Sequence, residues 1–201
     1  MQIKSSDRIA IFGKTGTGKT TFTKRVLWPL YTRRVFHDAK CESNDLLTNA
    51  ALCRTPNELQ QVIKNGKVSI LYQPANLSPD DFNKVCEIVY QATNFTLFVD
   101  EVSKFCSPSW IEPWHDEIMT RGRSRGVGIV NLSQRPRRCH NTVISEAEHF
   151  LVYRLQLETD IAKIKEILPK KYADMISTLP YHHCIYSDSL GQIKLLAPIR
   201  L

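Results

Sequence analysis

A glycine-rich segment near the amino terminus has the composition and spacing of a phosphate-binding loop. Residues 13–20 read GKTGTGKT and match the pattern G-x-x-x-x-G-K-[ST] in full. Glycines let the backbone close around a phosphate, and the loop N–H groups with the following helix attract the anion. Lys19 would reach the β- and γ-phosphates, and the Thr20 hydroxyl would bind Mg²⁺. We therefore predict a nucleotide site formed by Gly13, Lys14, Thr15, Gly16, Thr17, Gly18, Lys19, Thr20 and Thr21.

Two carboxylates follow an apolar segment later in the chain. Residues 95–99 (FTLFV) precede Asp100 and Glu101. The aspartate would hold Mg²⁺, and the glutamate would polarise an attacking water as general base. Small-molecule kinases must exclude water and usually lack the second acid, so the pair indicates a hydrolase. A strand expected at 68–72, between the loop and the pair in sequence, suits the P-loop class that has an inserted central strand and a catalytic glutamate.

A third polar group surrounds the apolar segment 127–132. Gln134 follows this segment, and its amide would orient the water or sense the γ-phosphate. Arg121 and Arg123 precede the segment, and one of them would be a finger that reaches the ATP of a neighbouring subunit. Arginines of this tract are also suited to contacting a nucleic-acid backbone, or to forming a solvated basic loop.

Apolar runs alternate with helical patterns along the chain. Such alternation predicts right-handed β–α–β units and a mainly parallel sheet with helices on both faces. Ligands of such sheets bind at the carboxyl ends of the strands, which is where the three motifs fall. The pattern predicts strands at 8–12, 33–38, 68–72, 95–99, 127–132 and 150–153, helices at 20–30, 55–65, 78–93, 114–123, 159–168 and 171–178, and a final hairpin from 183–186 and 192–196. Residues 41–54 are ambiguous.

The composition of the 201 residues is that of a globular protein. The counts of 10 Pro and 8 Gly are too low for a collagen-like or low-complexity chain. No apolar run has the length of a membrane helix or a secretory leader, so we expect no transmembrane segment. The 6 cysteines are scattered without a C-x-x-C pair, which favours reduced thiols over a zinc site or a disulfide framework. A net charge of 27 − 20 = +7 allows a polyanionic partner without establishing one.

Four features in this order resemble the FtsK–HerA superfamily of DNA-translocating ATPases. They are GKTGTGKT (13–20), LFVDE (97–101), TRGRSRGVGIVNLSQRP (120–136) and the strand–helix alternation between them. The chain is close to a bare motor core, which is similar to the genome-packaging ATPases of tailless, membrane-containing icosahedral viruses, some of them archaeal. The resemblance implies an α/β, RecA-like P-loop NTPase fold of the ASCE class, with residues 1–201 as a single domain.

The resemblance also implies a mode of action. ATP would be hydrolysed with Mg²⁺ at the interfaces of a homo-oligomeric ring of five or six subunits, and double-stranded DNA would thread the centre. By position, Lys19 and Thr20 match the family's phosphate and metal residues, Asp100 its metal residue, Glu101 its base and Gln134 its sensor. A capsid vertex or a membrane protein would be a further partner. The expected location is the cytoplasm of the host cell, with association with the virion as the alternative.

Other functions stay open at this point. A plasmid or cellular DNA-pumping ATPase of the same superfamily would use the same residues. A nucleotide kinase or a GTP-binding switch is a further alternative, although we find no N-K-x-D-type guanine motif. A DNA-binding module with a vestigial site would not need the complete motor set. Two insert-like segments, 103–113 and 135–141, are candidates to face DNA, with packing the favoured role for the aromatics Phe105 and Trp110.

Overall fold

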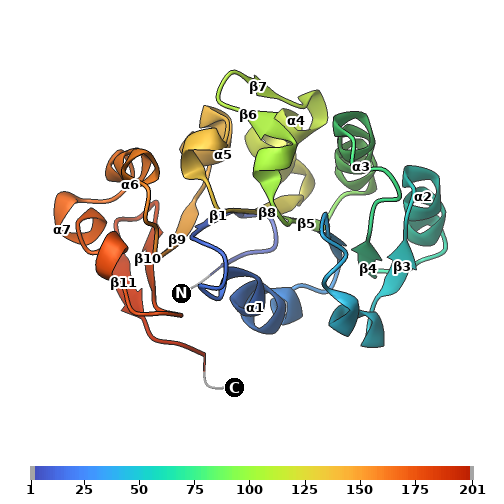
Figure 1. Ribbon diagram of the computed structural model, residues 1–201. Coiled ribbons are helices and arrows are strands. Elements are labelled where there is room, and N and C mark those ends of the chain that lie inside the picture. Colours follow the sequence, from blue (N-terminus) through green and yellow to red (C-terminus); the bar gives the residue numbers. More distant parts are fainter. Residues whose placement is uncertain (1–2, 200–201) are drawn as a thin grey trace.

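A nine-stranded sheet runs through the molecule in the order β11-β10-β9-β1-β8-β5-β2-β4-β3 (Figure 1). The computed structural model describes residues 3–199. Every pairing from β9 to β3 is parallel, and the hairpin β10–β11 adds antiparallel strands at one edge. The predicted sheet and closing hairpin are therefore confirmed. The strands are β1 (Arg8–Phe12), β2 (Arg34–His37), β3 (Ala51–Cys53), β4 (Ser69–Tyr72), β5 (Thr96–Val99), β8 (Gly128–Ser133), β9 (His149–Tyr153), β10 (Cys184–Asp188) and β11 (Ile193–Leu196).

Helices cover both faces of the sheet, but unequally (Figure 1). One face carries α2 (Pro56–Lys64), α3 (Pro79–Ala92), α4 (Pro113–Arg121), α5 (Asn141–Ser145) and α6 (Glu158–Lys165), with α7 (Lys170–Ala173) following in the chain. The other face carries α1 (Lys19–Phe22), which continues through a π-helical turn (Thr23–Leu27) and a 3-10 turn (Trp28–Leu30). The helical segment predicted at 20–30 is thus present, with irregular winding from Thr23 onward.

The central strands are buried on both faces, because each face packs against its own apolar core. In β1, Ala10 and Phe12 join the core under α2 to α6, whereas Ile9 and Ile11 join the core under α1. This alternation follows from the two-residue period of a strand. Burial on both sides explains why β1, β5 and β8 read as continuous apolar runs.

Two helices begin where the sequence predicts them. Thr55 and Ser78 are the N-caps of α2 and α3, and their hydroxyls accept hydrogen bonds from the backbone N–H groups of Glu58 and Asp81. A proline follows each cap at the first helical position. There the missing N–H costs nothing, since that group has no partner inside the helix.

The inserted central strand is β8, which lies between β1 and β5. The strand predicted at 68–72 is present as β4, but it lies beyond β2 and does not separate the phosphate loop from the acidic pair. The interpretation of 68–72 as the inserted central strand was therefore wrong. Strand order depends on long-range pairing, which does not follow chain order.

Some short elements were not predicted. They include β3, within the ambiguous stretch 41–54, the small hairpin β6 (Cys106–Ser107) and β7 (Trp110–Ile111), and helix α5. Each has five or fewer residues, too few for a clear period. Within residues 3–199, no helix is both long and apolar enough to span a bilayer. Five of the six free thiols are buried, and Cys41 is exposed.

Candidate active site

The phosphate loop connects the end of β1 to the start of α1 and is tightly packed from below. A Cβ added at Gly13 would lie 2.5 Å from the Cβ of Tyr153 in β9, so only glycine fits there. Gly18 precedes α1 with a left-handed backbone (φ 100°), which also favours glycine. The loop is joined to both neighbouring strands, because Gly13 N–H donates to the Ser133 carbonyl and Lys14 N–H donates to the Arg154 carbonyl.

Lys19 is held directly over this loop. Its buried ammonium donates to the carbonyls of Gly13 (2.6 Å) and Lys14 (3.1 Å). Burial lowers the pKa of Lys19 to about 8, while the carboxylates of Glu101 and Asp100 oppose that shift. A phosphate bound in the loop would meet this ammonium and would stabilise its charged form.

The acidic pair lies at the carboxyl end of β5. The phosphate loop follows the carboxyl end of β1, so both lie on the same side of the molecule. Asp100 and Glu101 are both buried, with 3% and 9% of their surface exposed. Burial raises the pKa of Asp100, and the nearby Lys40 ammonium opposes that rise. Glu101 has a left-handed backbone (φ 58°, ψ 53°), which is unusual for a residue with a side chain. Strained backbones of this kind concentrate at functional positions.

Gln134 connects the loop to the acidic pair. Its amide nitrogen donates to Glu101 Oε2 (3.0 Å), and its amide oxygen accepts from the Thr15 hydroxyl (2.6 Å). The three residues come from the ends of β5, β8 and β1, which are adjacent strands. The structure therefore brings the phosphate loop, the acidic pair and Gln134 together at the carboxyl ends of these strands.

Lys40 is a residue of this site that the sequence motifs did not identify. Its ammonium lies 3.7 Å from Asp100 Oδ2 and 3.7 Å from Glu101 Oε1. It follows β2, which pairs with β5, so its segment ends at the same edge. The signal available in the sequence was a pair of charged residues at the end of the strand predicted at 33–38, since Asp38 closes that strand and Lys40 follows it. Asp38 is buried beside it and accepts from the Ser43 N–H (2.8 Å).

The oxygen atoms near the loop fit a magnesium ion. Asp100 Oδ1 is buried and has no hydrogen-bond partner among the residues that the structure describes. Mg²⁺ prefers oxygen donors and is commonly held by one or two protein groups together with the phosphates of its nucleotide. Asp100 and the Thr20 hydroxyl at the start of α1 are the residues that would hold it, and the ion would neutralise charge on the phosphates.

Comparison with known proteins bears on this arrangement. No family model matches the sequence. The DNA packaging ATPase P9 of Enterobacteria phage PRD1 is 22% identical over 206 residues, which cover 96% of this chain and 87% of that protein. The genome packaging NTPase B204 from Sulfolobus turreted icosahedral virus 2, solved with ATP-gammaS, superimposes with a TM-score of 0.86 at 16% identity, over 98% of this chain and 100% of that one. The chain has the P-loop NTPase fold of these packaging proteins.

The same fold is also found outside viral proteins. VirB4 of Thermoanaerobacter pseudethanolicus superimposes with a TM-score of 0.75 at 9% identity, over 96% of this chain and 89% of that one. The resemblance and the RecA-like fold predicted from the four sequence features are confirmed by these similarities.

The two arginines predicted as fingers lie at the amino ends of the parallel strands, whereas the phosphate loop lies at their carboxyl ends. They precede β8, whose first residues pair with the beginnings of β1 and β5. Arg121 bridges to Glu117 (3.1 Å) within α4, and Arg123 bridges to Glu148 (2.9 Å) before β9. Neither is brought to the site that Glu101 and Gln134 form. A role in hydrolysis therefore requires the nucleotide of another subunit, as the prediction of a trans finger specifies.

The loop after Gln134 is anchored by a residue that the sequence did not single out. Asp160 of α6 is 1% exposed and accepts from Arg135 Nε (2.7 Å) and from the Arg137 N–H (3.1 Å). Of the two insert-like segments, 103–113 forms the β6–β7 hairpin. Phe105 is buried there, whereas Trp110 is 45% exposed. Packing thus accounts for Phe105 and not for Trp110.

Proposed function

We propose that this chain is an ATP-driven translocase of double-stranded DNA that packages a viral genome into a preformed capsid. The observation that carries the proposal is the pair of hydrogen bonds at Gln134, which donates to Glu101 and accepts from Thr15. They link a hydrolytic carboxylate to the loop that binds the phosphates, as a motor requires. The similarity to two viral packaging ATPases supports DNA packaging as the use of that motor.

The chemistry assigned to the site is hydrolysis of the γ-phosphate. Glu101 takes the proton of the attacking water, and the Gln134 amide orients that water. Lys19 neutralises charge that develops on the phosphate oxygens. Departure of the γ-phosphate leaves Gln134 with a different set of partners, and its loop transmits this difference toward α6 through Arg135 and Asp160. Thr20 and Asp100 would hold Mg²⁺, which would supply charge stabilisation.

The proposed working form is a homo-oligomeric ring of five or six subunits around the DNA. A head-to-tail interface that closes produces such a ring. It would bring the edge that carries Arg121 and Arg123 to the phosphate loop of the next subunit, where one of them would act on ATP in trans. The chain would work as a single RecA-like domain, in the host cytoplasm or in association with the virion. A capsid vertex protein or a membrane protein would be its binding partner.

A plasmid or cellular DNA pump would use the same residues, and the fold alone does not separate it from a packaging motor. The sequence similarity to the packaging ATPase P9 over 96% of this chain is what favours packaging. The Asp100–Glu101 pair, buried beside the loop, argues against a nucleotide kinase, which must keep water from the γ-phosphate.

The test is the rate of ATP hydrolysis with and without duplex DNA, at low and at moderate salt. We expect DNA to stimulate hydrolysis and the stimulation to weaken as salt rises, because phosphate contacts release counterions. Glu101→Gln is the control, and it should bind ATP without turnover. Hydrolysis by the wild type that ignores DNA, or phosphate transfer to an added nucleotide, would contradict the proposal.

A further inference from the structure

Two buried carboxylates share one ammonium in the candidate active site. Lys40 Nζ lies 3.7 Å from Asp100 Oδ2 and 3.7 Å from Glu101 Oε1. A hydrogen bond between such groups is shorter, about 2.7–2.9 Å, so both contacts are ion pairs without a hydrogen bond. Asp100 Oδ1 and Glu101 Oε1 have no hydrogen-bond partner among the residues that the structure describes. Charge attraction is therefore what holds the Lys40 ammonium beside the acidic pair.

The backbone that carries Lys40 is fixed, whereas its side chain is free to move. The Asp38 carboxylate accepts from the Ser43 N–H (2.8 Å) and from the Gln73 amide (3.1 Å). The Asp38 carbonyl accepts from the Cys41 N–H (3.2 Å), which closes a turn around Lys40. The Lys40 side chain is 28% exposed, and its four-carbon stem is flexible. Its ammonium can thus leave the carboxylates while the turn stays in place.

The acidic pair needs a cation beside it in every state. Burial disfavours charge on Asp100 and Glu101, and the two adjacent carboxylates repel each other. In this structure Lys40 supplies the positive charge, because the Lys19 ammonium donates to carbonyls of the phosphate loop. A Mg²⁺ ion on Asp100 would supply the charge instead and would repel the Lys40 ammonium. Lys40 and the metal are therefore alternatives at the pair.

We propose that Lys40 is a positioning residue that occupies the acidic pair in the nucleotide-free protein, excludes Mg²⁺ from it, and gives way when the metal arrives with a nucleotide. The proposal rests on the proposed nucleotide site and deepens it by adding control over metal binding. A nucleotide brings phosphate oxygens as further ligands for the ion. Metal and nucleotide together thus displace an ion pair that the metal alone does not.

The first test is the midpoint of thermal unfolding with Mg²⁺ alone, at constant ionic strength and without nucleotide. Lys40→Met removes the ammonium and keeps a long side chain. Mg²⁺ should raise the midpoint of this variant by about 2 °C or more, since the freed carboxylates bind it only in the native state, and should shift the wild type by less than about 1 °C. Lys165→Met is the matched control, because Lys165 forms an exposed bridge to Asp174 (3.2 Å), and it should behave as the wild type does.

The second test is calorimetric binding of the non-hydrolysable analogue AMPPCP, once with Mg²⁺ and once with EDTA. Without metal, Lys40→Met should bind AMPPCP about tenfold more weakly than the wild type, because the triphosphate then meets two carboxylates that lack a counter-ion. With Mg²⁺, its affinity should equal or exceed that of the wild type. Lys40→Arg keeps the charge and should match the wild type in both conditions.

The outcomes are decisive in both directions. Equal effects of Mg²⁺ alone on the wild type and on Lys40→Met would overturn the proposal, because Lys40 would then not exclude the ion. Weaker binding of AMPPCP by Lys40→Met in Mg²⁺ would also overturn it, since Lys40 would then belong to the loaded site. So would a Lys40→Arg variant that behaves as Lys40→Met does.

Lys19→Ala separates this proposal from the proposed function. AMPPCP binding that survives Lys19→Ala in both conditions would remove the nucleotide site itself. Loss of AMPPCP binding in Lys19→Ala, together with wild-type behaviour of Lys40→Met, would overturn the role of Lys40 alone.

Discussion

At the scale of single residues, the backbone of Glu101 is the first to consider. A left-handed conformation costs a residue with a side chain about 1–2 kcal/mol, and glycine is exempt. Glu101→Gly and Glu101→Ala both lose the bond from Gln134 and the proximity of Lys40. We predict that the glycine variant unfolds with a free energy about 1 kcal/mol higher than the alanine variant, and that neither hydrolyses ATP. Chemical denaturation measures the difference, and equal stabilities would show that Glu101 stores no strain.

The pKa of Lys19 determines how we expect nucleotide binding to depend on pH. Its pKa is about 8 because burial disfavours the ammonium, and a triphosphate beside Nζ would raise that pKa. Between the two values, binding must take up a proton, so ATP affinity is full below about pH 8 and falls as the pH rises above it. Calorimetry in two buffers with different ionisation enthalpies should detect this uptake just above that pH. Lys19→Arg should abolish it, and uptake that persists in that variant would assign the proton to another group.

At the scale of elements, the loop after β8 is fixed by α6. Asp160→Asn removes the charge that holds Arg135 while keeping the side-chain shape. We predict a kcat for ATP about tenfold lower with KM nearly unchanged, because the variant displaces Gln134 and leaves the phosphate loop alone. Steady-state kinetics measures the split. Asp174→Asn is the control, since Asp174 forms an exposed bridge to Lys165 and should have no effect. An unchanged kcat in Asp160→Asn would show that the contact with Arg135 does not position Gln134.

The elements also show what the sequence can predict and what it cannot. Apolar runs such as 95–99 and 127–132 predict β5 and β8 well, because strands buried on both faces leave a continuous signal. Capping residues such as Thr55 locate helix starts for a local reason. The place of β8 between β1 and β5 was not predicted, since it depends on pairing between distant segments.

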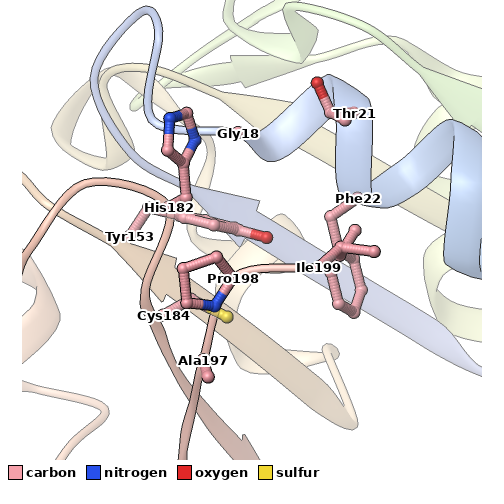
Figure 2. A pocket seen from close by; sticks show the side chains of 9 residues that line it. All are labelled: Gly18, Thr21, Phe22, Tyr153, His182, Cys184, Ala197, Pro198 and Ile199. Carbon is pink, nitrogen blue, oxygen red and sulfur yellow. The ribbon is translucent and has the colours of Figure 1, made fainter. Parts of the chain in front are cut away.

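The residues of the site also fall into two groups, those that the sequence predicts and those that it does not. The loop 13–20, Glu101 and Gln134 were predicted from the sequence because the chemistry assigned to them requires fixed residue types beside strand ends. Lys40 and Asp160 act through contacts across the fold, 3.7 Å from Glu101 and 2.7 Å from Arg135, and no local pattern marks such contacts. Nor does a local pattern mark the pocket beside Gly18, because residues far along the chain, such as His182 and Ile199, line it (Figure 2).

At the scale of the whole molecule, the parallel sheet has two unlike ends. The carboxyl ends of the strands carry the phosphate loop, Glu101 and Gln134, and the amino ends carry Arg121 and Arg123. Such polarity suits a head-to-tail ring, in which each interface would join an end with ATP to an end with arginine. The net charge of +7 suits a polyanion such as DNA.

The most direct test of a DNA motor is movement along DNA. A triplex-displacement assay measures whether the protein, loaded on duplex DNA, removes a third strand ahead of it. The wild type should displace the strand only with hydrolysable ATP and Mg²⁺, and Glu101→Gln should bind the same DNA without displacement. Displacement that proceeds without hydrolysis, or DNA-stimulated hydrolysis that never displaces the strand, would contradict the assignment of this chain as a translocase.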